Sequence, residues 1–415
     1  MQKIVLITDF TPTADNINGP SALCYYIFKT LSSEYEVYIY STNSNKVCGE
    51  MLEISKKTFG KKLHIIPRSL WMKILIWKKT SWLFSLFYPS NMPKLGRYKL
   101  PKRVVKYITK LRPDLIVVYP MSMIGPLIQL KKLNTLVIGP DCFSLHYIRA
   151  LRTPYYYKEE KLGYAIERIK YETYLAKIVD KYAKSIALVG KEDCVLYNTI
   201  TNGSKAVFLP HPHYSLVDKN IDFNKQRLKV IITGNYNEYT DVDVDIMVTH
   251  LIDEASKLRE FDFYFLGKSW KAIVNHLKPY LAVEHKTWVD NYVEELKDYD
   301  IQIFPICIGS GTKGKVLDAA SNGLLCIGSY YAFENIAIKP NESCILYNHA
   351  SEIPKILENV FQNKQKYQDF AIRSRDSVRK FHDVHVAAEQ IKGILKGEKS
   401  IIDDRKYLYK NKENH

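Results

Sequence analysis

The residues best suited to chemistry lie in one short segment, residues 309–323, which reads Gly-Ser-Gly-Thr-Lys-Gly-Lys-Val-Leu-Asp-Ala-Ala-Ser-Asn-Gly. An apolar run before it (301–306) predicts a buried strand, and residues 316–321 predict a helix. Glycines and small hydroxyl residues at such a junction let backbone N–H groups approach an anion, and the helix N-terminus adds a positive dipole. Asp318, about one turn into the helix, could accept hydrogen bonds from ribose hydroxyls. The segment therefore predicts a nucleoside diphosphate site.

Two common phosphate motifs do not fit this segment. A P-loop needs Gly-Lys followed by Ser or Thr, and the dinucleotide fingerprint needs G-x-G-x-x-G opening the first strand–helix unit. A glycine-rich turn between a strand and a helix also occurs in α/β proteins that bind no nucleotide. The segment alone therefore leaves both interpretations open.

A more specific resemblance extends beyond the glycines. Residues 309–323, followed by an apolar strand (324–328) and by Ser-Tyr-Tyr-Ala-Phe-Glu-Asn (329–335), resemble the donor-site segment of GT-B glycosyltransferases. Among these the segment is most similar to the retaining bacterial polysaccharide enzymes of the glycosyltransferase family 4 type. The resemblance is most specific over residues 285–345. It implies an α/β fold of two Rossmann-like, doubly wound domains facing across a cleft, and a UDP- or GDP-sugar donor with no cofactor and no metal.

The resemblance assigns expected roles to individual residues. Asp318 and Glu334 would contact the ribose or the sugar, and Trp288 with Val289 would border the nucleobase. The residues expected at the donor diphosphate are Ser310, Gly311, Thr312, Lys313, Lys315, Gly19 and Gly234. Many relatives carry two glutamates eight positions apart, whereas this chain has Ser310 and Asp318 there. The role of the first glutamate therefore cannot be transferred.

The first half of the chain offers candidates for acceptor positioning. Asp141 and His146 follow the end of a predicted strand (136–139) and are the catalytic candidates. No general base is assigned, because in front-face retention the leaving phosphate can take the acceptor proton. Gly19 lies in Asn-Gly-Pro-Ser, which could meet a phosphate or acceptor, or could form a turn in which Ser21 caps a helix. Asp-Val-Asp-Val-Asp (241–245) is interpreted as a helix start rather than a metal site.

Positive charge is concentrated in one region. The formal net charge is +16, and residues 54–113 contain 16 Lys or Arg and no Asp or Glu. Tryptophans alternate with lysines there, which is typical of a segment lying on an anionic membrane surface. The residues expected at the membrane are Trp71, Lys73, Trp77, Lys78, Lys79 and Trp82. A helix with core aromatics and solvated lysines is the alternative, and no nucleic-acid module is recognisable.

The length of 415 residues favours two or three domains. We expect an N-terminal Rossmann-like acceptor domain (1–210) with the basic aromatic insertion (54–113), and a C-terminal donor domain (211–383). A last helix (384–397) would pack back on the first domain, and a basic tail (398–415) would be disordered. Seven dispersed cysteines, with no CxxC pair, indicate reduced thiols. No signal peptide or transmembrane segment is expected, which favours a cytoplasmic protein attached peripherally to the inner face of the cell membrane.

The leading hypothesis is a glycosyltransferase that moves a hexose from a nucleotide sugar to a glycan or polyprenyl-linked acceptor in the synthesis of capsule, O-antigen or another surface polysaccharide. Two alternatives remain at this stage. A UDP-sugar epimerase shares the fold but has no use for a membrane-seeking segment. A non-catalytic sugar- or nucleotide-binding scaffold could have lost the first acidic residue.

Overall fold

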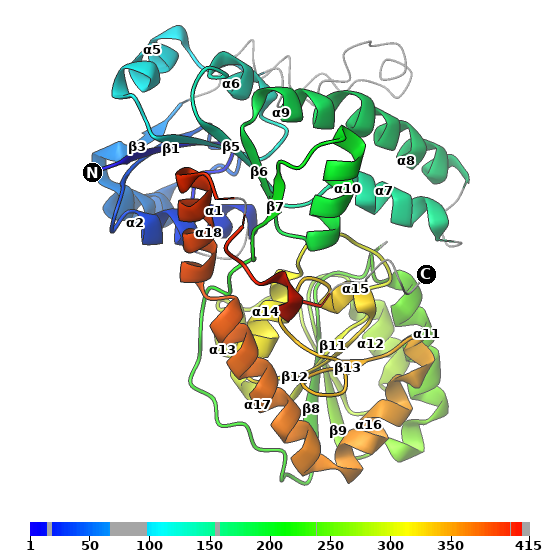
Figure 1. The fold of residues 1–415 in the computed structure, drawn as a ribbon. Coiled ribbons are helices and arrows are strands. Elements are labelled where there is room, and N and C mark those ends of the chain that lie inside the picture. The colour runs from blue at the N-terminus through cyan, green and yellow to red at the C-terminus, as the bar shows by residue number, and fades with distance from the viewer. Residues whose placement is uncertain (15–18, 67–97, 154–157, 238, 399, 409–415) are drawn as a thin grey trace. The chain divides into compact units, whose positions relative to one another are not determined.

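The computed structural model describes residues 1–14, 19–66, 98–153, 158–237, 239–398 and 400–408. It divides into two compact units, each described separately below (Figure 1). The first contains Met1–His211 with Val384–Asp403, and the second contains Pro212–Asp383 with the described residues from Asp404 onward. The sequence placed domain boundaries after residues 210 and 383.

The first unit is built on a parallel sheet. Among the described residues this sheet has seven strands, in the order β3-β2-β1-β4-β5-β6-β7. The strands are β1 (Lys3–Thr8), β2 (Glu36–Ser41), β3 (Leu63–Ile65), β4 (Leu115–Tyr119), β5 (Thr135–Gly139), β6 (Ser185–Leu188) and β7 (Ala206–Phe208). Leu6 of β1 pairs with Ile39 on one side and Val117 on the other. The inner strands are buried on both faces, which explains their continuous apolar sequences.

Helices cover both faces of this sheet (Figure 1). Helices α1, α2 and α18 lie on one face, and Ile4, Leu6 and Val117 of the sheet pack there against Phe28 of α1 and Ile391 of α18. The helices of the unit are α1 (Gly19–Leu31), α2 (Gly49–Phe59), α5 (Lys102–Leu111), α6 (Ile124–Gln129), α7 (Phe143–Arg152), α8 (Lys158–Lys170), α9 (Ala176–Tyr182), α10 (Lys191–Thr201) and α18 (Val384–Lys396). The last helix of the chain therefore belongs to the core of the first unit.

The second unit repeats the plan. Within the described residues its sheet has six parallel strands in the order β10-β9-β8-β11-β12-β13. The strands are β8 (Leu228–Thr233), β9 (Phe261–Leu266), β10 (Val283–Lys286), β11 (Ile301–Phe304), β12 (Leu325–Gly328) and β13 (Ile345–Leu346). The helices are α11 (Asp241–Asp253), α12 (Lys271–Leu277), α13 (Tyr292–Glu295), α14 (Gly314–Ser321), α15 (Tyr330–Phe333), α16 (Ile353–Gln362) and α17 (Lys364–Phe381). Both sheets therefore have the Rossmann strand order, with the first strand of each unit central, which confirms the predicted fold class.

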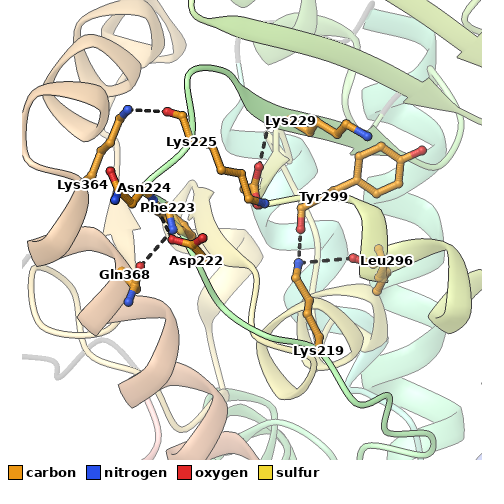
Figure 2. Close-up of polar contacts among 11 residues, drawn as sticks. Lys219, Asp222, Phe223, Asn224, Lys225, Lys229, Leu296, Tyr299, Lys364 and Gln368 are labelled. Atoms are coloured by element: carbon orange, nitrogen blue, oxygen red, sulfur yellow. Dashed lines mark hydrogen bonds and ion pairs between the residues drawn. The ribbon is translucent and has the colours of Figure 1, made fainter.

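The segment that leads into β8 is fixed to the second unit (Figure 2). Lys219 donates hydrogen bonds to the carbonyl oxygens of Leu296 and Tyr299, at the C-terminal end of the helical stretch that begins with α13. Lys225 forms an ion pair of 2.6 Å with the buried carboxylate of Asp300. These contacts place the connecting segment on the surface of the second unit and hold the end of the α13 region.

The end of the chain differs from expectation over its described part. Residues from 398 onward were predicted to be disordered, but Tyr407 is only 4% exposed and its hydroxyl donates to the carbonyl of Phe381 at 2.8 Å. Leu408 N donates to Ile336 O at 2.9 Å. A single aromatic side chain with a buried site anchors the tail, and the high polarity of the surrounding sequence hid this signal. Among the described helices, none is both long enough and apolar enough to span a bilayer.

Candidate functional site

The glycine-rich loop leaves the carboxyl edge of the second sheet. It follows β11 and ends where α14 begins at Gly314, so Asp318 is the fifth residue of the helix, as the sequence indicated. Lys313 closes the loop from within, because its ammonium donates to the carbonyl oxygens of Ser310 at 2.7 Å and Gly311 at 3.0 Å. A Cβ on Gly309 would lie 3.0 Å from Lys313 Cε. Lys313 therefore shapes the loop that carries it.

Glu334 gives Lys313 a second partner. It ends α15, is fully buried, and places its carboxylate 3.9 Å from the Lys313 ammonium. The charge of Lys313 is thus balanced inside the protein. The sequence predicted a diphosphate contact for Lys313 and a sugar or ribose contact for Glu334, and the structure directs these two side chains toward each other.

Lys315 lies differently although it is only two residues further on. A Cβ on Gly234, which follows β8, would lie 3.0 Å from the Lys315 ammonium, so two residues predicted at the diphosphate meet from separate strand–helix junctions. The same ammonium lies 6.0 Å from the ring centroid of Tyr292. The side chain as a whole is exposed, yet its ammonium loses hydration against these neighbours, which lowers the pKa of Lys315; the nearby carboxylate of Asp318 opposes that shift.

The turn at Gly234 is fixed from behind. Trp270 Nε1 donates to the carbonyl oxygen of Gly234 at 2.9 Å, and Trp270 is itself buried. Gly267 has a φ of 142°, and a Cβ there would lie 1.8 Å from the same oxygen. Only glycine fits this approach. The surface facing Lys315 is therefore rigid.

Asp318 and three further polar side chains lie beneath the lysine. Asp318 is 2% exposed, and burial together with its negative charge raises the pKa of the Tyr292 hydroxyl. That hydroxyl lies 3.2 Å from Thr233 Oγ1, and Gln302 Nε2 donates to it at 3.2 Å. Gln302 also donates to Thr233 at 2.8 Å. Sequence reasoning missed Thr233, Gln302 and Tyr292; the one available signal was a glutamine inside the apolar strand before the glycine loop.

The predicted nucleobase residues follow β10, at the same carboxyl edge of the sheet. Trp288 is 60% exposed, whereas Val289 is half-buried and packs against the cluster that contains Val316 and Leu317 of α14. An exposed tryptophan beside a packed valine provides an accessible ring on a fixed support. Their role at a base remains a prediction.

The residues predicted in the first unit have separate surroundings. Asp141 lies two residues before the start of α7, and the His146 ring lies against the rings of Tyr147 and Tyr164, both with centroids 5.7 Å away. Gly19 is the first residue of α1. Ser21 was considered as the cap of this helix and lies inside it, because Pro20 is favoured in a first turn and the helix begins earlier. Its hydroxyl accepts a hydrogen bond from Asn45 Nδ2 at 2.8 Å instead.

Two remaining predictions concern the membrane and metals. All six residues expected at the membrane, the three tryptophans and three lysines between Trp71 and Trp82, fall within 67–97 and so lie outside the described residues. Asp241 is the first residue of α11, which confirms the interpretation of the acidic repeat as a helix start, and Asp243 accepts a hydrogen bond of 2.6 Å from Tyr347. Among the described residues, no group of three or more His, Cys, Asp or Glu is arranged to hold a metal ion.

Known structures with the same architecture are glycosyltransferases. Anabaena HepE in complex with UDP-glucose has 10% identity and a TM-score of 0.64, over 96% of this chain and 100% of that chain. A Rickettsia africae glycosyltransferase has 12% identity and a TM-score of 0.63, over 95% and 98%. S. aureus TarM, in complex with fondaparinux, alpha-GlcNAc-glycerol and UDP, has 9% identity and a TM-score of 0.60, over 95% and 100%.

Sequence comparison adds nothing to these structural neighbours, because no protein-family model and no curated protein matches the chain. The structural match spans nearly the whole of each protein, and both sheets have the strand order that the architecture requires. At such low identity the match establishes the fold alone. The chain has the GT-B fold found in these glycosyltransferases.

Proposed function

We propose that this protein is a glycosyltransferase that moves a sugar from a nucleoside diphosphate sugar to a glycan acceptor. One observation carries the proposal: the Lys315 ammonium lies against the Gly234 turn at the start of α14. This arrangement provides a cation, the free N–H groups of a helix N-terminus and a close approach to backbone at one point.

The reaction needs these elements. Departure of a nucleoside diphosphate develops negative charge on the leaving phosphate, and fixed N–H dipoles and cations stabilise that charge. Lys315 and the first turn of α14 would bind the diphosphate, and Asp318 would accept hydrogen bonds from ribose hydroxyls. Lys313 and Glu334 would hold the loop in shape. Because the site has its own cation, no metal is needed for the leaving group.

The donor and stereochemistry follow from the resemblance and the neighbours. HepE was crystallised with UDP-glucose and TarM with UDP, which favours a UDP-sugar donor here. The resemblance to family 4 enzymes favours retention of anomeric configuration. Asp141 and His146 are the candidates for positioning the acceptor.

A lipid-linked acceptor at an anionic membrane surface is the finer part of the proposal. It is supported by the 16 cationic residues, with no acidic residue, over 54–113. Within the described part of that segment, α5 leaves Lys102, Lys106 and Lys110 exposed beside Tyr107, whose side chain is 48% exposed. A polyprenyl-diphosphate acceptor would lie at such a surface, on the inner face of the membrane, in the synthesis of a surface polysaccharide such as capsule or O-antigen.

The donor site is tested by thermal stabilisation with UDP, GDP, ADP, dTDP and CMP. We expect selective stabilisation by one diphosphate, worth about 2.7 kcal/mol at 100 times its Kd, and its loss in Asp318→Asn. No shift with any nucleotide would contradict the site. Release of UDP from UDP-glucose by the wild type would separate an enzyme from a scaffold, and NMR of the recovered sugar nucleotide would reveal an epimerase.

The membrane is tested by sedimentation with vesicles of phosphatidylcholine, with and without phosphatidylglycerol. We expect binding only to the anionic vesicles, and its loss when Lys73, Lys78 and Lys79 are changed to Gln. Equal binding to neutral vesicles would argue against electrostatic attachment.

A further inference from the structure

Tyr292 connects the inside of the second sheet to the lysine above it. Its hydroxyl lies within hydrogen-bond distance of Thr233 at the end of β8 and of Gln302 in β11, and its ring lies 6.0 Å from the Lys315 ammonium. Three segments that are far apart in the sequence thus converge on one ring. A tyrosine whose function was packing alone would not need both ends engaged.

The anchor of this ring has a cost to stability. Gln302 is fully buried in a central strand between Ile301 and Ile303, and its Oε1 has no hydrogen-bond partner among the described residues. A buried carbonyl without a partner costs about 1–3 kcal/mol. An aliphatic residue would avoid this cost, so the glutamine indicates that the polar contacts to Thr233 and Tyr292 matter beyond packing.

A lysine needs such a support. Its ammonium is a point charge on a flexible four-carbon stem, so its direction is set by what surrounds it. Here the Gly234 turn lies on one side and the Tyr292 ring provides a second surface. The attraction between an ammonium and an aromatic face favours this placement over rotamers that point into solvent.

We infer that Tyr292 is a positioning residue, which holds the Lys315 ammonium against the Gly234 turn while Thr233 and Gln302 fix the orientation of its ring. The inference rests on the proposed function, in which Lys315 binds the donor diphosphate. It adds a residue from a separate element, α13, and predicts that Tyr292 acts on the nucleotide only through Lys315.

The test is a double-mutant cycle on UDP affinity, measured by calorimetry with the full-length protein. Cation–π support worth about 0.5–2 kcal/mol corresponds to roughly 2- to 30-fold in Kd. We expect Tyr292→Leu to weaken UDP binding by about 5-fold in the wild type and by less than about 2-fold in the Lys315→Met background. Equal weakening in both backgrounds would overturn the inference.

A matched control is available in the same unit. Lys229 lies 5.8 Å from the ring centroid of Tyr264, which repeats the lysine–tyrosine geometry away from the glycine loop. Tyr264→Leu removes a ring of the same kind and should leave UDP affinity unchanged. If Tyr264→Leu weakens binding as much as Tyr292→Leu does, a general loss of packing explains both, and the inference fails.

A gentler variant covers the case in which Tyr292→Leu does not fold. Tyr292→Phe keeps the ring and removes the two hydroxyl contacts, so we expect a loss of about 2-fold in UDP affinity that again disappears in Lys315→Met. Persistence of this loss without Lys315 would refute the role. If Lys315→Met itself leaves UDP affinity unchanged, the proposed diphosphate site fails, which is distinguishable from additive effects, where Tyr292 alone is misassigned.

Discussion

The two units have the same strand order but different chemistry at the junctions that follow their central strands. In the first unit the loop after β1 is held by neutral groups: Thr11 N donates to Asn45 Oδ1 at 2.9 Å, and Thr11 Oγ1 lies 2.9 Å from Ser41 Oγ. In the second unit the loop after β11 is held by a lysine that lies near a buried carboxylate. The strand order therefore determines where a ligand can bind, and the junction residues determine which ligand.

The largest expected effect compares one glycine in each unit. Gly267→Ala would place a Cβ 1.8 Å from the Gly234 carbonyl at a φ of 142°, so backbone must move. We expect a loss of about 3 kcal/mol in the free energy of unfolding, together with UDP binding, measured by denaturant titration and calorimetry. In the first unit, Gly139→Ala would meet only side-chain atoms of Leu188 and Met121, at 2.9 and 3.0 Å. Because these can shift, we expect about 1 kcal/mol; equal losses would show that backbone contact is not decisive.

The second prediction separates the two lysines of the donor loop. Lys313→Met leaves the fully buried carboxylate of Glu334 without its cation, so we expect about 2–3 kcal/mol of destabilisation. Adding Glu334→Gln should restore part of this loss, since the uncompensated charge is then removed. Lys315→Met should change the free energy of unfolding by less than about 0.5 kcal/mol, because its side chain is exposed. The reverse ranking in thermal or denaturant unfolding would exchange the two roles.

These lysines also show where sequence reasoning ends. The strands were predictable because buried parallel strands are continuous apolar runs, and Asp318 could be placed because its helix begins at the last glycine. The opposite directions of Lys313 and Lys315 were not, since Lys313 has an extended backbone (φ −90°, ψ 103°) and Lys315 is already helical. Nor could the sequence bring together Thr233, Tyr292 and Gln302, which meet only after the sheet has formed. Local pattern predicts elements, and non-local packing determines which side chains share a site.

The third prediction uses pH to sharpen the role of Lys315. Loss of hydration lowers the pKa of this ammonium from its ordinary value of 10.5, so its positive charge is present below that lowered pKa and is lost as pH rises through it. We expect UDP affinity to fall by about 10-fold over that alkaline range, measured by calorimetry in buffers of matched ionic strength. Lys315→Arg, which stays charged, should abolish this fall. An unchanged alkaline fall in the arginine variant would assign it to another group.

The smallest effect is expected in the first unit. The Ser21 hydroxyl accepts one hydrogen bond of 2.8 Å from Asn45, which also bonds Thr11, so Ser21→Ala removes one contact from a network that keeps its others. We expect about 0.5–1 kcal/mol of destabilisation and no change in UDP affinity, because this junction holds its loop with neutral groups and has no role at the diphosphate in the proposed site. Asn45→Ala removes the contacts to Thr11 as well and should cost more stability, again without loss of UDP affinity. A clear loss of UDP affinity in either variant would show that the β1–α1 junction, which includes Gly19, contributes to donor binding, and the difference drawn between the two junctions would then concern stability alone.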